Sequence, residues 1–129
     1  MSILTKNIKL VGTDIDGVWT DARMYYSAEG DVMKSFSTYD GMGIKLLREA
    51  DIPLIIMTGE DTEIVAKRAE KLGIERVFQG EDEKLNRLKE VCSELNISLD
   101  EVAYIGDDIN DLDVLKAVGL SAMPPNSPI

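Results

Sequence analysis

The sequence predicts an α/β fold in which a parallel β-sheet is flanked by helices. Short apolar segments alternate with longer amphipathic segments along most of the chain, which is the pattern of strands connected by helices. Carboxylates and other polar residues follow directly after several of the apolar segments. Because ligands of open α/β sheets bind at the carboxyl ends of the strands, this arrangement also predicts a functional site at that edge.

The first part of the chain begins with a short apolar strand that runs into an acidic loop. Two alternating segments around a glycine-containing turn follow this loop and predict a β-hairpin. A helix comes next, and then a strand that is apolar on both faces, as a buried parallel strand should be. The predicted bounds are 8–12 for the first strand, about 22–37 for the hairpin, about 40–50 for the helix and 53–57 for the second strand.

The second part of the chain continues the alternation of helix and strand. A charged amphipathic helix ends at Gly73, and glycine commonly terminates helices. Ser98 and Glu101 have the spacing of a capping box. The predicted elements are a helix at 60–72, a strand at 76–79, a helix at 81–95, a strand at 102–105, a helix at about 111–117 and a short strand near 120–122. We expect residues 1–129 to form a single domain, because they contain no linker and no internal repeat.

The composition excludes several kinds of function. The chain has no histidine, which removes a Ser-His-Asp triad, a Cys-His pair and a histidine-ligated zinc site. Acid–base chemistry therefore falls to Asp, Glu, Lys or Tyr. The net charge of −10 argues against a nucleic-acid surface, and no apolar segment is long enough to predict a membrane helix. The single Cys92 is expected to be buried and unreactive; together with the lack of a signal peptide it favours a cytoplasmic protein.

The predicted hairpin carries apolar side chains that its two strands cannot bury by themselves. Met24, Tyr26, Met33 and Phe36 would form an exposed patch on a hairpin too small to be a domain. We therefore expect the hairpin to pack against another subunit.

Asp14 and Asp16 form the most informative pair of residues in the sequence. They follow the first strand at a spacing of two, which places both side chains on the same side of an extended chain. Two ionised carboxylates in such proximity repel each other unless a cation lies between them. The cation that best suits these oxygen ligands is Mg²⁺. The pair thus predicts a metal-assisted acidic site at the end of the first strand.

Three further polar groups fall at or just beyond the ends of predicted strands. They are Thr58, Lys84 at the start of its helix, and the acidic cluster Asp107, Asp108 and Asp111. Each group alone is weak evidence, because a Thr-Gly pair is usually a turn, a lysine is usually surface charge and acidic residues commonly begin helices. Their order along the chain and their shared position argue against a chance arrangement.

The chain resembles the haloacid dehalogenase superfamily of phosphohydrolases over nearly its whole length. All four motifs of the superfamily match in order, as Asp14-Ile15-Asp16-Gly17-Val18-x-Thr20, Thr58-Gly59, Lys84 and Gly106-Asp107-Asp108-x-x-Asp111. The resemblance implies a Rossmann-like α/β fold and the hydrolysis of a phosphate ester through an aspartyl-phosphate.

The resemblance also implies a role for each residue that would contact the phosphoryl group. Asp14 would be the nucleophile that attacks phosphorus. Asp16 would protonate the leaving oxygen and then deprotonate the attacking water. Thr58 and Lys84 would bind the transferring phosphoryl oxygens, where negative charge must be balanced.

The metal ligands implied by the resemblance come from two loops. Mg²⁺ would be held by Asp14, by the backbone carbonyl of Asp16 and by Asp107. Asp108 and Asp111 would hold water molecules or orient these ligands.

Many members of the superfamily carry a cap domain after the first motif or after the Thr-Gly motif. Neither interval has room for one here, so the chain resembles the capless branch, which closes its sites by oligomerisation. The stretch from residue 20 through residue 44 looks like that of the phosphatases of 3-deoxy-octulosonate 8-phosphate and of its nine-carbon relatives. Those enzymes are homotetramers whose hairpins form a central barrel. The resemblance therefore implies a homotetramer joined through the hairpin and a phosphorylated sugar acid as the small-molecule partner.

The residue after Thr58 and Gly59 distinguishes the two kinds of sugar-acid phosphatase. It is typically Arg in the eight-carbon enzymes, whereas Glu60 resembles the nine-carbon, sialic-acid-like enzymes. Gly59, Glu60, Arg68 and Lys71 are therefore candidates for substrate binding. On a helix that begins at residue 60, Lys71 would return to within roughly 20° of Glu60, with Arg68 beside them. The alternative is an ordinary solvated helix face with ion pairs.

We therefore predict a Mg²⁺-dependent phosphatase of a nine-carbon 2-keto-3-deoxy sugar acid 9-phosphate. Within the same class, the alternatives are 3-deoxy-D-manno-octulosonate 8-phosphate and a broad range of sugar phosphates. A different class is a non-catalytic phospho-acceptor of the receiver type, which lacks an acid–base residue at the position of Asp16. An oligomeric scaffold derived from an enzyme is the remaining alternative.

Overall fold

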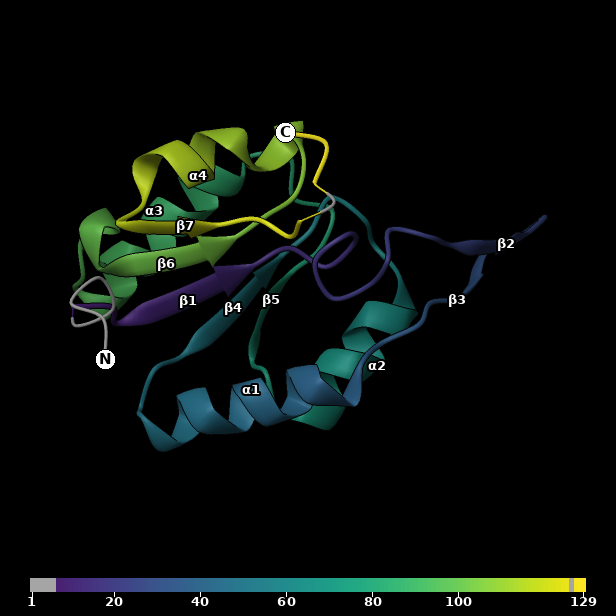
Figure 1. Ribbon diagram of the computed structural model, residues 1–129, viewed down its shortest axis with the longest axis horizontal. Helices are drawn as coiled ribbons and strands as arrows, with labels where there is room; N and C mark the ends of the chain where they lie inside the picture. Colours follow the sequence, from purple (N-terminus) through teal and green to yellow (C-terminus); the bar gives the residue numbers. More distant parts are fainter. Residues whose placement is uncertain (1–6, 126) are drawn as a thin grey trace.

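A parallel sheet of five strands forms the centre of the molecule (Figure 1). The structure is a computed structural model, and it describes residues 7–125 and 127–129. The strand order is β5-β4-β1-β6-β7, and every neighbouring pair is parallel. The strands are β1 (Leu10–Thr13), β4 (Leu54–Met57), β5 (Arg76–Phe78), β6 (Val102–Ile105) and β7 (Leu120–Ala122). The predicted α/β fold is confirmed.

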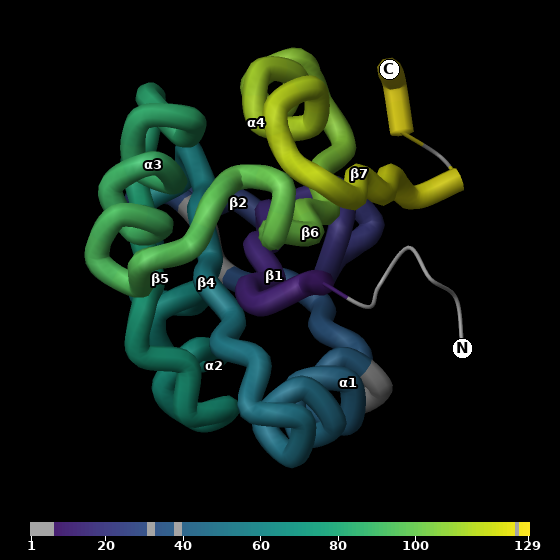
Figure 2. Tube along the Cα trace, turned by 90° about the vertical axis from the view of Figure 1, so that its left-hand side faces the viewer, coloured from purple at the N-terminus to yellow at the C-terminus, as the bar shows by residue number. Residues whose placement is uncertain are grey.

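Helices cover both faces of this sheet, as the end-on view shows (Figure 2). One face carries α1 (Thr38–Glu49) and α2 (Glu63–Leu72), and the other carries α3 (Lys84–Leu95) and α4 (Leu112–Ala117). Short 3₁₀ turns, η2 (Leu99–Glu101) and η3 (Ile109–Asp111), precede β6 and α4. The predicted capping box between Ser98 and Glu101 is present at η2. Within the described residues, no helix has the length and apolar character needed to cross a bilayer.

The register of the sheet brings the ends of its central strands to one level. Thr13, the last residue of β1, lies opposite Ile56 of β4 and Ile105 of β6. The loops that follow these three strands therefore leave the sheet side by side. This is the edge at which the sequence predicts a site.

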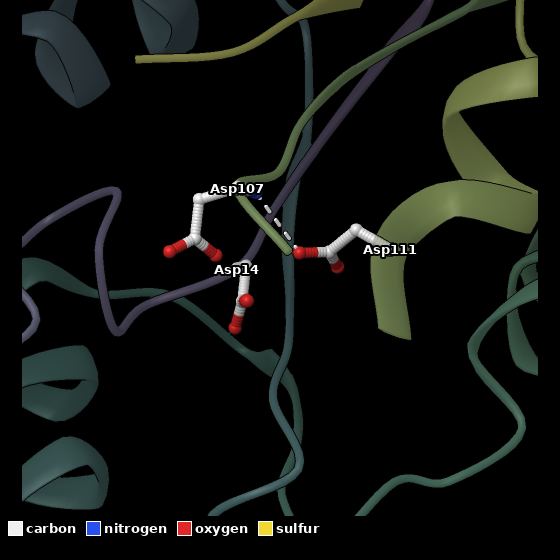
Figure 3. Close-up of side chains that lie close together, drawn as sticks. All are labelled: Asp14, Asp107 and Asp111. Atoms are coloured by element: carbon white, nitrogen blue, oxygen red, sulfur yellow. Dashed lines mark hydrogen bonds between the residues drawn. The ribbon is translucent and has the colours of Figure 1, made fainter. Parts of the chain in front are cut away.

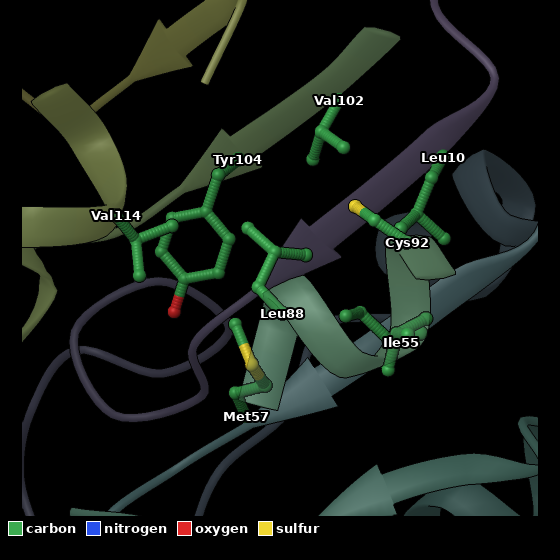
Figure 4. Close-up of a cluster of buried hydrophobic side chains, with 9 residues drawn as sticks. Leu10, Ile55, Met57, Leu88, Cys92, Val102, Tyr104 and Val114 are labelled. Carbon is green, nitrogen blue, oxygen red and sulfur yellow. The ribbon is translucent and has the colours of Figure 1, made fainter. Parts of the chain in front are cut away.

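The core fills the space between the sheet and its helices (Figure 4). Tyr104, Leu88 and Met57 are completely buried on the α3 side, where Cys92 is also buried, as predicted. Gly12 of β1 leaves room for the aromatic ring, because a Cβ atom there would lie 2.8 Å from a ring carbon of Tyr104. A second cluster on the α1 and α2 side includes Ile15, Trp19, Ile44, Ile56, Val65, Ala69 and Ile74.

The predicted hairpin is present, and it extends beyond the carboxyl edge of the sheet (Figure 1). Its strands are β2 (Tyr25–Ser27) and β3 (Gly30–Met33), which pair antiparallel. Tyr26 and Met33 are more than half exposed, as expected. Phe36 is an exception to the expected exposed patch, because it packs on the core cluster beneath α2. Among the described residues, only the hairpin and the α2 crossover lie in the two intervals in which a cap domain could be inserted.

The start of α2 corrects one prediction. The helix begins at Glu63 rather than at residue 60, because the Thr62 hydroxyl accepts a hydrogen bond from the backbone N–H of Val65 and caps the helix there. Glu60 therefore lies in the loop after β4. The predicted helical stripe that would place Glu60 in line with Lys71 does not exist.

Candidate active site

Three buried aspartates converge at the carboxyl edge of the sheet (Figure 3). Asp14 follows β1, Asp107 follows β6, and Asp111 ends the η3 turn. One carboxylate oxygen from each lies within 4.8 Å of the others. Each of the three residues is at most 8% exposed. Three acidic groups this close and this dry form a candidate site for a metal ion.

The loops around this cluster are held by the backbone. The Asp14 N–H donates a hydrogen bond to the carbonyl of Ile105, so the backbone pairing with β6 continues for one residue beyond the end of β1. Gly17 has φ +84°, and a Cβ atom there would lie 1.7 Å from Oδ2 of Asp107. Only glycine allows the loop after β1 to pass so close to the Asp107 carboxylate.

Lys84 supplies the positive charge of the cluster. It is the first residue of α3, and it is only 3% exposed. Its Nζ lies 2.7 Å from Oδ1 of Asp111 and 3.4 Å from Oδ2 of Asp14. The predicted convergence of Lys84 with the acidic residues is therefore present in the structure.

Asp111 accepts three hydrogen bonds, and both of its carboxylate oxygens take part. Its Oδ1 accepts bonds from Lys84 and from the Tyr104 hydroxyl, the latter at 2.8 Å. Its Oδ2 accepts a bond from the Asp107 N–H at 3.1 Å, drawn as the dashed line in Figure 3. Asp111 therefore fixes the positions of Lys84 and of the Asp107 loop, and Asp14 and Asp107 are left as the better candidates to contact a metal.

The charges in the cluster are not balanced by the protein alone. Burial raises the pKa of Asp14 to about 8, with the Asp111 carboxylate adding to this effect and Lys84 opposing it. Burial, followed by the charge of Asp111, also raises the pKa of Asp107. Burial would raise the pKa of Asp111 as well, but the hydrogen bond and charge of Lys84 lower it overall. Among the described residues, Lys84 is the one lysine paired with carboxylates of this cluster, so a divalent cation would favour the ionised form of Asp14.

The aspartate cluster opens into a polar cavity of about 280 Å³. A second cavity of about 480 Å³ lies beside the hairpin and shares Glu60 with the first. The first cavity is lined by Asp14, Asp16, Ala22, Met24, Thr58, Gly59, Glu60, Asp107, Asp108 and Asn110. Most of the predicted site residues therefore meet in one place, and the lining also includes Met24, which the sequence had placed in the exposed patch of the hairpin.

The remaining polar residues of the predicted site differ in their surroundings. Thr58 is buried, and its Oγ1 accepts a hydrogen bond from the Glu60 N–H at 3.3 Å. Asp108 is exposed and caps the η3 turn through a bond from the Ile109 N–H. Asp16 lines the cavity and forms an ion pair with Lys34, whose Nζ lies 2.7 Å from Oδ1 of Asp16. Lys34 was not among the residues predicted from the sequence.

Arg68 and Lys71 lie outside the lining of the cavity. The Arg68 guanidinium donates to the carbonyl of Ser37 at 3.1 Å and lies 5.6 Å from the centre of the Phe36 ring. These contacts tie α2 to the segment between the hairpin and α1. A substrate-binding role for Arg68 and Lys71 stays a prediction.

Comparisons with known proteins agree with this arrangement. A family model described as haloacid dehalogenase-like hydrolase matches residues 32–119. The chain is 40% identical over 124 residues to 3-deoxy-D-manno-octulosonate 8-phosphate phosphatase KdsC from Haemophilus influenzae, a match that covers 96% of this chain and 69% of the relative. It is 40% identical over 115 residues to the protein of the same name from Yersinia pestis, covering 89% and 62%.

A solved structure of a similar protein carries ligands. It is the 3-deoxy-D-manno-octulosonate 8-phosphate phosphatase of Moraxella catarrhalis in complex with magnesium, phosphate and KDO. It superposes with a TM-score of 0.91 at 39% sequence identity, and the match covers 96% of this chain and 71% of that one.

The raised pKa of Asp14 predicts how its replacement changes stability. A carboxyl whose pKa is raised from 3.8 to about 8 on folding contributes stability that is fully present below pH 3.8 and is lost progressively as the pH rises to about 8. Asparagine stays neutral throughout. In the presence of a chelator, we expect the Tm of Asp14→Asn to exceed that of the wild type by several degrees more at about pH 9 than at about pH 6.

Thermal unfolding followed by circular dichroism measures this difference. Asp82→Asn is the matched control, because Asp82 is exposed and lies outside the cluster. The same Tm difference for Asp14→Asn at both pH values would show that Asp14 does not carry a raised pKa.

Proposed function

The chain belongs to the haloacid dehalogenase-like hydrolases, and on this basis we propose that it is a Mg²⁺-dependent phosphatase of a phosphorylated 3-deoxy sugar acid. The observation that carries this proposal is the meeting of Asp14, Asp107 and Lys84 beside a cavity that Asp16 also lines. The family is one of hydrolases, which favours an enzyme over the receiver-like and scaffold alternatives.

The site has the ligands that Mg²⁺ prefers. The Asp14 and Asp107 carboxylates and the backbone carbonyl of Asp16 would hold the ion, because hard oxygen ligands suit it and because Asp111 is already engaged by hydrogen bonds. Without a cation, burial raises the pKa of Asp14 and disfavours its ionised form. A metal ion beside Asp14 would favour the ionised form, which is the form that acts as the nucleophile in this proposal. When bound, the ion would offset negative charge on the phosphoryl oxygens and orient them toward Asp14.

Two carboxyl groups divide the chemistry between them. A carboxylate oxygen of Asp14 attacks phosphorus, and the bond from phosphorus to the ester oxygen breaks as Asp16 gives its proton to that oxygen. This step releases an alcohol and leaves an aspartyl-phosphate on Asp14. Asp16 then takes a proton from water, and the water oxygen attacks phosphorus. The bond to Asp14 breaks, inorganic phosphate leaves, and both carboxyl groups return to their first state.

Thr58 contacts the phosphoryl group in this proposal, whereas Lys84 lies outside the cavity lining and acts on the charge of that group from beside Asp14. Lys84 lies at the start of α3, so its ammonium group and the positive end of the helix dipole favour negative charge at the same place. Thr58 is buried at the end of β4 and lines the cavity. Both groups would balance the charge of the transferring phosphoryl group.

The substrate that we propose first is 3-deoxy-D-manno-octulosonate 8-phosphate. The relatives at 40% identity carry the name of its phosphatase, and the match covers 62–69% of their length. The sizes and positions of the two cavities agree with a sugar phosphate as substrate. The cavity of about 280 Å³ at the aspartates can take the phosphoryl group, and the adjoining cavity of about 480 Å³ can take part of a polar leaving group.

A nine-carbon sugar acid 9-phosphate is the second candidate, and Glu60 favours it. Glu60 lines both cavities, directly after Thr58 and Gly59. A carboxylate at this position accepts hydrogen bonds from hydroxyl or amide groups and repels a substrate carboxylate. An arginine at the same position would do the opposite.

We further propose that the protein assembles as a homotetramer through its hairpin. Tyr25, Tyr26 and Met33 are 56%, 65% and 54% exposed, and all three lie on β2 or β3. Such a concentration of large apolar side chains is expected where another subunit packs. Sedimentation analysis should give the mass of four chains, and the mass of a single chain would contradict this assembly.

Phosphate release tests the proposed activity. We expect release from 3-deoxy-D-manno-octulosonate 8-phosphate in the presence of Mg²⁺, and loss of that release when the metal is chelated. Asp14→Asn should lower kcat by at least about 10³-fold, because it removes the nucleophile. Release by the variant at the wild-type rate would show that Asp14 is not the nucleophile.

The preference between the two substrates tests the role of Glu60. We expect Glu60→Arg to raise the ratio of kcat/KM for the eight-carbon substrate over the nine-carbon substrate by about 10-fold, because it removes the carboxylate that would accept hydrogen bonds from hydroxyl or amide groups of the nine-carbon substrate. Glu70→Arg is the matched control, since it makes the same charge change at an exposed residue that lines neither cavity. An unchanged ratio in Glu60→Arg would remove Glu60 from the determinants of specificity.

A further inference from the structure

A partly buried ion pair joins the hairpin to the candidate active site. The Lys34 side chain is 0% exposed, and its Nζ lies 2.7 Å from Oδ1 of Asp16. Lysine is rarely buried so completely, because an ammonium group loses its hydration when it leaves water. A buried lysine therefore needs an acceptor of opposite charge, and Asp16 is that acceptor here.

The two partners come from different parts of the chain. Asp16 lies in the loop after β1, and Lys34 directly follows β3 of the hairpin. Asp16 lines the cavity, whereas Lys34 is absent from its lining and has no exposed side-chain surface. A ligand in the cavity can therefore contact Asp16 but not Lys34. Lys34 can influence chemistry in the cavity through Asp16, which it contacts and which lines the cavity.

We propose that Lys34 is a positioning residue that holds the Asp16 carboxyl group in place for proton transfer. An aspartate side chain can rotate among several conformers, and a charged hydrogen bond to one oxygen selects among them. With Oδ1 bound by Lys34, the second oxygen is left to exchange a proton with the ester oxygen and then with water. The inference rests on the proposed function, in which Asp16 carries out both transfers.

This role is distinct from a purely structural one. If the ion pair only anchored the hairpin, its loss would affect all substrates alike. If it positions Asp16, its loss affects the substrates whose leaving oxygen needs a proton. The alkoxide of a sugar is a poor leaving group and needs that proton, whereas p-nitrophenolate leaves without one.

The experiment compares two phosphate esters in a small set of variants. The measured quantity is kcat/KM with Mg²⁺ for 3-deoxy-D-manno-octulosonate 8-phosphate and for p-nitrophenyl phosphate. We expect Lys34→Met to lower the value for the sugar phosphate by about 10-fold to 100-fold and that for the aryl phosphate by less than about 3-fold. Lys34→Arg, which keeps the charge, should recover much of the loss.

Lys9→Met is the matched control. Lys9 also forms a 2.7 Å ion pair, with Glu101, but its side chain is 61% exposed and it lies just before β1, at the opposite edge of the sheet from the cluster. We expect this variant to keep the wild-type values for both esters. Lys34→Gln serves as a second variant should the methionine variant fail to fold, because its amide can still donate to Asp16 while it lacks the charge. It should show the same selective loss to a smaller extent.

A double variant tests whether Lys34 acts through Asp16. In an Asp16→Asn background, Lys34→Met should cause no further selective loss on the sugar phosphate, because the group that it positions is gone. Equal losses on both esters in Lys34→Met, or a selective loss that persists in the Asp16→Asn background, would overturn the proposal.

The wild type separates this proposal from the proposed function. If the wild type hydrolyses neither ester, the proposed function fails and the role of Lys34 fails with it. If the wild type hydrolyses both esters and the Lys34 variants do not distinguish them, only the role of Lys34 is overturned.

Discussion

The site is constrained by the unfavourable free energy of burying three carboxylates close together. Asp14, Asp107 and Asp111 are buried at the end of the sheet, and Lys84 is the cation in contact with Asp14 and Asp111. Burial raises the pKa of Asp14 to about 8, so the folded protein without a metal disfavours the ionised form of this carboxyl group. A fold that keeps such a cluster gives up stability at this edge of the sheet, which is the usual relation between a functional site and its scaffold. A divalent cation would relieve the repulsion and favour the ionised Asp14 that our proposed reaction requires.

The surrounding elements are arranged to hold this cluster in one geometry. Tyr104 reaches from the core to Asp111, and Asp111 in turn fixes Lys84 and the Asp107 loop. Gly17 lets the first loop pass against Asp107. The hairpin adds Lys34, so an insertion that extends away from the sheet also reaches back to Asp16. In our proposals the hairpin therefore has two roles, because it both positions an acid–base group and presents an apolar surface to other subunits.

Much of this arrangement could be predicted from the sequence, and the reasons are local. Asp14, Thr58 and Asp107 each follow an apolar strand, and parallel strands end at one edge whatever the details of the packing. The contact between Lys34 and Asp16 could not be predicted in this way, because it spans 18 residues and depends on how the hairpin turns back toward the sheet.

The predicted start of α2 is wrong, although the residue that caps this helix stands in the sequence. Thr62 caps α2 and is held by Gln79 across the loop after β5, whereas the charged residues before it fit a helical pattern equally well. Phe36 was expected on the surface because alternation alone does not reveal that α2 packs over that segment.

The most direct test of the account is to trap the phosphoryl group on Asp14. The Asp16→Asn variant lacks the base that activates water, so p-nitrophenyl phosphate should phosphorylate it faster than water can remove the group. The protein is mixed with this ester and Mg²⁺, quenched in acid and digested, and its peptides are weighed by mass spectrometry. The account predicts one added phosphoryl group on the peptide that contains Asp14, and none when Asp14→Asn is added to the variant. Release of p-nitrophenolate without any phosphorylated Asp14 would contradict the claim that this buried carboxylate is the nucleophile.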